Sequence, residues 1–217
     1  MRLNSLAITE FVALLRSSAP APGGGSASAL VGANGVALGM MAANLTVGKK
    51  KYADFAPIAE KARTDLEPLC DALLLCLEKD TEAFDAVMDA MKLPKETDEQ
   101  KAIRKEAIQS ATKEATLVPL SLLRLLRESI SVLMTMQDAV NPNCVSDLGV
   151  GASCLRTAAE GAWLNVCINL GGLSDEDFVA SVHAEAHRLY TETVALSSAL
   201  FLAVEEKLRP VCNQTEA

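Results

Sequence analysis

Aromatic residues are scarce in this sequence, at 4% of 217 residues, although half of the residues are apolar. A core therefore has to be filled by Leu, Ala, Val and Met, and side chains of this kind favour helices over strands. No useful stretch alternates apolar and polar residues as a half-buried strand does. Composition and length together predict an all-α protein, and we take residues 1–217 as a single domain.

Positive charge, histidine and paired cysteines are also scarce. The formal charge is −8, which is unfavourable for binding nucleic acid. The two histidines, His183 and His187, lie one helical turn apart but lack the rest of a zinc-helix signature, so we expect solvated or partner-facing side chains and no metal site. The six cysteines form no CxxC pair and lie in apolar, helix-like segments. This pattern is typical of buried, reduced thiols and predicts a cytoplasmic protein.

Charge is absent altogether from residues 17–48, a stretch long enough to cross a membrane. It opens with prolines and three glycines, and the remainder is mostly Ala, Gly and Ser, so its hydrophobicity per residue is low. We therefore expect no membrane span. A helix without charge on any side can instead lie in the middle of a protein or of an oligomer.

Local signals predict an all-α bundle of about six helices, several of them long. Pro68 and Pro119 fall inside long helices and predict kinks. Thr97 and Gln100 form a capping-box pattern at a helix start. Residues 213–217 are expected to be frayed. The expected helices span about 5–16, 26–47, 57–91, 98–138, 146–169 and 174–208.

One acidic residue interrupts an apolar helical stripe. Asp80 occupies the position between Leu77 and Phe84 at which a helix with this stripe would carry another apolar side chain. Burial and neighbouring charges tune the ionisation of such a carboxyl group, so it is a candidate for proton transfer. The alternative is a partly buried ion pair with an arginine of another helix. The stripe comprises Leu66, Leu69, Leu73, Cys76, Leu77, Phe84, Val87, Met88 and Met91.

Three other features are candidates for ligand binding. The glycine turn at residues 23–25 precedes Ser26, a predicted N-cap, and offers free N–H groups at a helix N-terminus, although many such turns are only turns. Lys49–Lys51 either face a site or form a solvated helix end. Asn143 and Asp147 precede a helix on which Asn165 and Asn169 share a face. These amides bind either a ligand or a neighbouring helix.

Seven segments occur in one order along the chain: SSAPAPGGGSASAL, ANLTVGKKKY, DTEAF, MKLPKETDEQK, VPL, NPNCVSDLGVGA and LNVCINL. Together they resemble the cyclodeaminase/cyclohydrolase family. That family includes the C-terminal half of bifunctional formiminotransferase-cyclodeaminase and free-standing bacterial enzymes. The resemblance covers about Leu6–Phe178.

The resemblance implies a helical homodimer or higher homo-oligomer that acts on a tetrahydrofolate derivative without a prosthetic group. Its first expected reaction is cyclisation of 5-formimidoyltetrahydrofolate to 5,10-methenyltetrahydrofolate with release of ammonia. The alternative is cyclohydrolysis of the methenyl bridge to 10-formyltetrahydrofolate, because GKKKY resembles cyclohydrolases whereas LNVCINL resembles cyclodeaminases. A third possibility is a non-catalytic helical interaction protein. The chain carries no formiminotransferase domain, so a separate formiminotransferase is a possible partner.

The resemblance also implies roles for individual residues. The acidic residue of the family falls on Asp80, which becomes the expected general acid/base. Lys49, Lys50 and Lys51 are then candidates for the glutamate carboxylates of a folate, including a polyglutamylated one. Asn143 and Asp147 are expected to hydrogen-bond the pterin. The remaining expected substrate-binding residues are Gly23, Gly24 and Gly25 in the pocket wall, with Ser26, Asn44 and Asn165.

Overall fold

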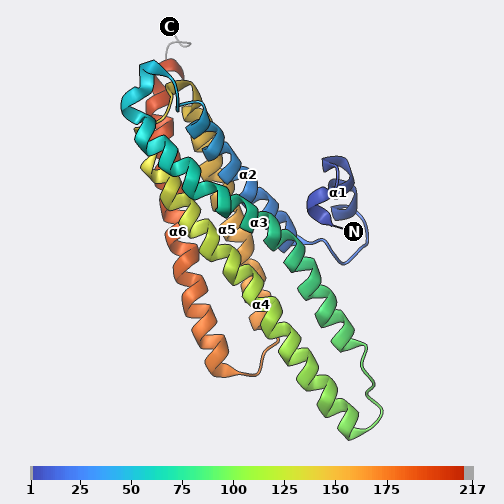
Figure 1. Ribbon diagram of the computed structural model, residues 1–217. Coiled ribbons are helices and arrows are strands. Elements are labelled where there is room, and N and C mark those ends of the chain that lie inside the picture. Colours follow the sequence, from blue (N-terminus) through green and yellow to red (C-terminus); the bar gives the residue numbers. More distant parts are fainter. Residues whose placement is uncertain (1, 213–217) are drawn as a thin grey trace.

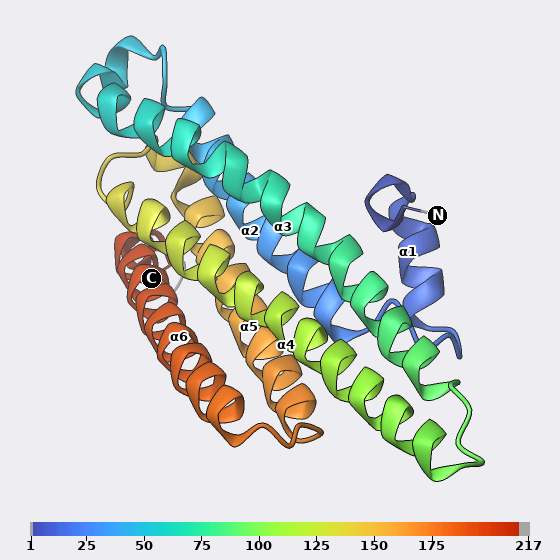
Figure 2. The same cartoon turned by 60° about the horizontal axis from the view of Figure 1, so that its bottom comes forward.

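The computed structural model describes residues 2–212, with side chains described as far as Arg209, and is all-α in this range as predicted. Five long helices lie side by side, and a short helix stands apart near the start of the second (Figures 1 and 2). The predicted fraying of 213–217 lies outside the described residues. The elements are η1 Leu3–Ser5, α1 Ile8–Leu15, α2 Gly24–Asn44, η2 Lys50–Phe55, α3 Ala56–Met91, α4 Asp98–Thr135, η3 Pro142–Cys144, α5 Val145–Leu170 and α6 Glu176–Cys212.

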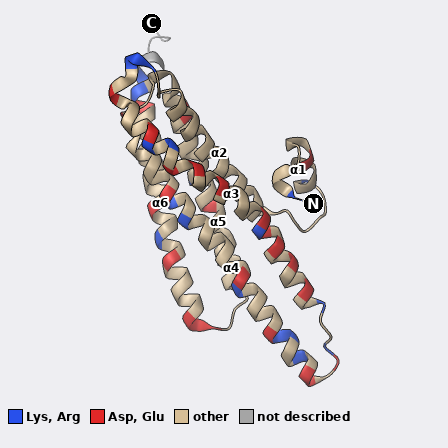
Figure 3. Cartoon of the chain, viewed as in Figure 1, with Lys and Arg blue, Asp and Glu red and all other residues tan. Residues whose placement is uncertain are grey.

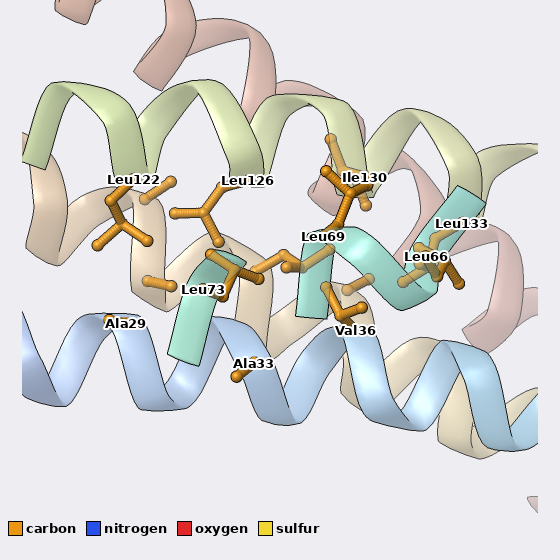
Figure 4. Close-up of a cluster of buried hydrophobic side chains, with 14 of the residues drawn as sticks. Ala29, Ala33, Val36, Leu66, Leu69, Leu73, Leu122, Leu126, Ile130 and Leu133 are labelled. Atoms are coloured by element: carbon orange, nitrogen blue, oxygen red, sulfur yellow. The ribbon is translucent and has the colours of Figure 1, made fainter. Parts of the chain in front are cut away.

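The uncharged helix α2 packs closely against α3 and α5. Its glycines permit close approach. A Cβ added at Gly35 would lie 2.8 Å from the carbonyl oxygen of Gly151, and one at Gly39 would lie 2.8 Å from Leu133 Cδ1. Leucines of α3 and α4 fill the space above the small residues of α2 (Figure 4). The small residues of α2 therefore serve first to pack this helix within its own chain.

Among the described residues, one helix is long and apolar enough to cross a membrane by length and composition alone, and it is α2. Over half of the apolar window, 56%, is buried inside the bundle. A core helix meets the same criteria, as the sequence led us to expect for this segment.

Two predicted N-caps are wrong, Ser26 and Ser146, and for Ser26 the hydroxyl group shows why. Gly23 is the N-cap of α2, and Ser26 lies within the first turn, where its hydroxyl donates to Asp80 instead of accepting a backbone N–H. Likewise Cys144, not Ser146, is the N-cap of α5. A side-chain acceptor on a neighbouring helix competes with the local cap, and only the fold brings that acceptor close.

Other helix boundaries follow local signals more closely. The Thr97–Gln100 capping box is present, as predicted. The first helix begins later than expected, at Ile8, because Glu10 accepts the N–H of Ala7 and so fixes the start of the helix there. The last helix begins at Glu176, two residues later than expected.

The long helices α3 and α4 continue through Pro68 and Pro119, respectively. The end of α3 and the start of α4 project beyond the other helices (Figure 2), and charged residues are frequent along this projection (Figure 3). Asp80 lies in the part of α3 that faces the beginning of α2. The fold thus brings the acid on the apolar stripe to the start of the uncharged helix.

Candidate active site

A pocket of about 320 Å³ lies at the start of α2, where this helix meets α3, α4 and α5. The loop before α2 contributes to its wall. Because residues from four helices and a loop meet here, the pocket exists only in the folded bundle. Its lining residues are Pro20, Ala21, Gly23, Gly24, Gly25, Asp80, Phe84, Val87, Thr112, Ala115, Asn165, Ile168 and Asn169.

Asp80 is the one ionisable residue that lines this pocket. Its Oδ2 accepts a hydrogen bond of 2.7 Å from the hydroxyl of Ser26, which is fully buried. Among the described side chains, no Lys, Arg or His lies within 4 Å of the carboxylate, so the alternative of an ion pair with arginine is wrong. Burial raises the pKa of the neighbouring Cys76 thiol, while the charge of Lys79 lowers it and the charge of Asp80 raises it. The carboxylate is thus held by one hydroxyl without a compensating cation.

Gly25 fixes how closely α2 approaches this carboxylate. A Cβ added at Gly25 would lie 2.0 Å from Asp80 Oδ1, closer than any side chain can sit. By contrast, a Cβ added at Gly23 would have its nearest neighbour at 4.0 Å, the carbonyl oxygen of Pro20. The glycine turn therefore contains one position that must lack a side chain and one that tolerates it.

The start of α2 supplies hydrogen-bond donors to the same pocket. Its N-cap, Gly23, has no side chain that could accept the N–H groups of the first turn. The first backbone bond of this helix runs from Ala27 to Gly23, so the N–H groups of Gly24, Gly25 and Ser26 precede the helical ladder. Such groups bind anionic or carbonyl oxygens. The pocket thus places donors beside an acidic acceptor.

The structure assembles half of the predicted site residues here. Gly23, Gly24 and Gly25 line the pocket with Asp80 and Asn165, and Ser26 supports Asp80.

The other predicted binding residues lie at the opposite end of α2. Asn44 is the last residue of this helix, and Lys49–Lys51 follow it, all exposed. Asn143 and Asp147 lie at the start of α5. This helix runs antiparallel to α2, because Gly35 of α2 contacts Gly151 of α5 and Gly24 contacts Asn165. A helix of 21 residues is about 30 Å long, so within one chain these residues are remote from Asp80.

The pocket residues that the predicted site did not include are mostly apolar wall, but Asn169, Thr112 and Phe84 are also among them. The spacing of Asn169 from Asn165 was a usable signal, because residues four apart share a helix face. Phe84 was interpreted as part of the apolar stripe, and it serves as pocket wall as well. Thr112 lies in the middle of α4 without any local pattern that marks it.

The two histidines lie on the outside of α6, away from this pocket. Their rings stand edge-on to Trp163, with centroid distances of 5.3 Å for His183 and 5.4 Å for His187. Within the described range, no three His, Cys, Asp or Glu side chains are grouped as metal ligands would be. The histidines thus take part in an aromatic surface cluster.

The helical bundle recurs in a solved structure, that of formiminotetrahydrofolate cyclodeaminase from Thermotoga maritima. The TM-score is 0.80 at 30% sequence identity, over 97% of this chain and 99% of the other. The shared architecture thus extends over both whole chains.

The family described as formiminotransferase-cyclodeaminase matches residues 7–188. The chain belongs to this family, which confirms the resemblance inferred from its motifs. It is 42% identical over 205 residues to methenyltetrahydrofolate cyclohydrolase of Methylorubrum extorquens, covering 93% of this chain and 97% of that protein. It is 36% identical to formimidoyltransferase-cyclodeaminase of Gallus gallus over 91% of this chain but only 36% of that protein. The chain therefore spans about a third of the bifunctional relative.

Proposed function

We propose that this protein is a folate enzyme that makes or opens the one-carbon bridge between N5 and N10 of tetrahydrofolate, with Asp80 as general acid/base. The observation that carries the proposal is the Asp80 carboxylate in the pocket, held by the Ser26 hydroxyl, with no Lys, Arg or His of the described residues in an ion pair with it. The names of the similar proteins, a cyclohydrolase and two cyclodeaminases, support the substrate class.

The reaction that we put first is cyclisation of 5-formimidoyltetrahydrofolate. N10 attacks the carbon of the protonated formimino group and loses its proton, and the carbon becomes tetrahedral with a neutral amino group on it. The bond from this carbon to the exocyclic nitrogen then breaks, and the nitrogen leaves as ammonia after gaining a proton. One carboxylate can accept the first proton and deliver the second, which is the chemistry of a general base that becomes a general acid.

The second candidate is the cyclohydrolase reaction, favoured by the 42% identical relative that matches nearly the full length of the chain. Here Asp80 takes a proton from water as the water adds to the methenyl carbon. The proton then passes to N5 as the bond from N5 to this carbon breaks. The hydroxyl group on the carbon loses its proton to solvent and becomes the carbonyl of the formyl group on N10. Either reaction changes only bonds to carbon, nitrogen, oxygen and hydrogen, so we propose an enzyme without a prosthetic group.

One pair of assays tests both candidates. The protein is incubated with 5-formimidoyltetrahydrofolate and, separately, with 5,10-methenyltetrahydrofolate, and the methenyl absorbance is followed with ammonia release. The first substrate should gain methenyl absorbance if the protein is a cyclodeaminase. The second should lose it faster than in buffer if the protein is a cyclohydrolase. No change with either substrate would contradict the proposal and favour a non-catalytic helical protein.

We further propose that the active form is a homodimer formed through α2 and α5. Each helix carries an uncharged stripe with the alternating spacing of four and three residues that is found in helix–helix seams. The α5 stripe includes two strongly exposed residues, Leu164 at 66% and Ile168 at 76%. The α2 stripe is Ala27, Val31, Asn34, Leu38, Met41 and Leu45, and the α5 stripe is Val150, Cys154, Thr157, Gly161, Leu164 and Ile168.

A twofold arrangement would also bring the separated binding residues together. If the axis passes near Asn34, in the middle of α2, the start of one α2 faces the end of the other. Lys49–Lys51 of the second copy would then approach the pocket of the first, where Ile168 belongs both to the seam and to the pocket wall. Three cations at the pocket mouth suit the glutamate carboxylates of a folate.

The oligomer is tested by light scattering after size-exclusion chromatography. Leu164→Glu should yield monomers, because it places a charge in the seam. Ile103→Glu, at a similarly exposed apolar position on the projecting end of α4, is the matched control and should leave the mass unchanged. A monomeric parent protein, or an unchanged mass in Leu164→Glu, would contradict the seam.

The shared site is tested by subunit mixing. Asp80→Asn and the triple variant Lys49→Ala, Lys50→Ala, Lys51→Ala should each turn over a polyglutamylated folate poorly. A mixed dimer would contain one pocket with both sets intact, so mixing should restore part of the activity. Activity that stays at the average of the two variants would show that each pocket uses the lysines of its own chain or none.

The name of the Gallus gallus relative pairs a formimidoyltransferase with a cyclodeaminase. If the reaction is cyclisation, we propose that a separate formiminotransferase supplies the 5-formimidoyltetrahydrofolate, in the cytoplasm. Cross-linking with a purified formiminotransferase, or faster transfer of the intermediate than free diffusion allows, is the corresponding measurement.

A further inference from the structure

Two asparagines of α5 line the pocket one helical turn apart, Asn165 and Asn169. Each donates one of its two amide N–H groups to the protein. Asn165 Nδ2 donates to the carbonyl of Gly161 over 2.8 Å, and Asn169 Nδ2 donates to the carbonyl of Ala115 over 3.0 Å. Because a carbonyl only accepts, these bonds fix which end of each amide is nitrogen. The orientation of both side chains is therefore set by backbone groups.

The amide oxygens are the unused half of these side chains. Among the described residues, no group donates a hydrogen bond to the Oδ1 atom of Asn165 or of Asn169. These two oxygens are not sealed in the core, because the one fully buried side-chain oxygen without a partner is that of Ser197. The two amide oxygens are thus open to a molecule in the pocket. With Asp80 they make three acceptor groups, and no Lys, Arg or His lines the same cavity.

The polar groups of the pocket select a particular kind of ligand edge. The side-chain oxygen atoms of Asn165, Asn169 and Asp80 accept hydrogen bonds from N–H groups of a ligand. The first turn of α2 instead offers N–H groups to an acceptor oxygen of the ligand. A ring edge with adjacent N–H and amino groups, next to a carbonyl oxygen, satisfies both sets. The pterin of a folate presents this combination in its N3–H, its 2-amino group and its 4-oxo group.

We propose that Asn165 and Asn169 are specificity-determining residues that accept hydrogen bonds from the N3–H and 2-amino edge of the pterin. This inference rests on the proposed folate function and assigns the pterin to the pocket end of α2. It replaces the assignment of the pterin to Asn143 and Asp147, which lie at the other end of that helix. The two amides orient the ring, and the proton transfers remain with Asp80.

The experiment compares two ligands and two kinds of variant by calorimetry. The ligands are tetrahydrofolate and its 2-desamino-2-methyl analogue, which lacks the amino donor. Asn165→Leu and Asn169→Leu remove the acceptor at nearly constant volume. Asn165→Asp and Asn169→Asp keep an acceptor oxygen and remove the donor to the backbone, so they report on any purely structural role.

The parent protein should bind tetrahydrofolate at least about tenfold more tightly than the analogue, the usual penalty for an unpaired buried polar group. The leucine variant that faces the 2-amino group should bind both ligands alike, the one that faces N3–H should bind both more weakly, and the aspartate variants should keep the preference. If neither leucine variant loses the preference, the inference is overturned. A parent protein that does not bind tetrahydrofolate would instead contradict the proposed function itself.

Discussion

The two ends of α2 carry different kinds of predicted binding residue, and only the start of the helix forms the pocket described above. At the start, a glycine lets α2 touch Asp80, and a buried serine donates to the carboxylate. At the end, Lys49–Lys51 stand exposed in solvent. The close approach of two helices forms a binding site within one chain. Exposed charged side chains form a binding site only when a ligand or a second copy contacts them.

Asp80→Asn is the strongest test of the pocket end. The amide is nearly isosteric, so the fold should persist while turnover falls by about a hundredfold to ten-thousandfold, the usual contribution of general acid–base catalysis. Steady-state rates on both folate substrates measure the loss, and circular dichroism checks the fold. Glu82→Gln, two residues further along the same helix on an exposed position, is the control and should be nearly silent. Full activity in Asp80→Asn would mean that another group moves the proton.

Gly25→Ala should also reduce turnover strongly, because its Cβ would occupy the place of the Asp80 carboxylate. We expect a loss of about tenfold to a hundredfold, since a displacement of about 1 Å at reacting groups has effects of this size. The matched control is Gly23→Ala, which meets nothing closer than 4.0 Å. Equal rates for the two variants would show that the contact between α2 and Asp80 is irrelevant to catalysis.

Replacing Lys49–Lys51 with alanine tests the other end of α2. We expect KM to rise several-fold for a polyglutamylated folate and little for the monoglutamate, with kcat unchanged, because the lysines would bind carboxylates remote from the reacting carbon. The ratio of the two KM values is the measurement. A KM that rises equally for both substrates would remove the lysines from this role.

The smallest expected effect concerns acid. The Lys113 ammonium and the N–H of Phe178 hold the pKa of the Asp175 carboxyl below its ordinary 3.8. Lys113 directly follows the pocket residue Thr112 in the sequence. A carboxyl group whose pKa is lower in the folded than in the unfolded state stabilises the fold at pH values above the unfolded-state pKa. This contribution disappears as the pH falls through the folded-state pKa. The protection factors for hydrogen exchange at residues 171–178, which compare each rate with the intrinsic rate at the same pH, should therefore fall below about pH 4. Asp175→Asn should abolish this change, and protection factors that stay constant with pH in the parent protein would contradict the assignment.

The sequence predicted the helices well because their signals are local. Periodicity located the buried half of the Asp80 stripe, and the capping box at Thr97 marked the start of α4. The family resemblance also placed Asp80 in the same expected site as the glycine turn. The role of Ser26 could not be predicted, because its partner is 54 residues away and a serine before a helix is normally a cap. Thr112 was unpredictable for the same reason, since only tertiary packing brings it to the pocket.

The pocket draws on residues from Pro20 to Asn169, so unfolding of any one of four helices destroys it. A folate that fits this pocket must therefore bind the native chain and not the unfolded chain. Mass action then links occupancy to thermal stability: ligand at a hundred times its Kd adds about 2.7 kcal/mol to the free energy of unfolding. Heat denaturation of an inactive variant such as Asp80→Asn would rank one-carbon folates by affinity while none of them is consumed.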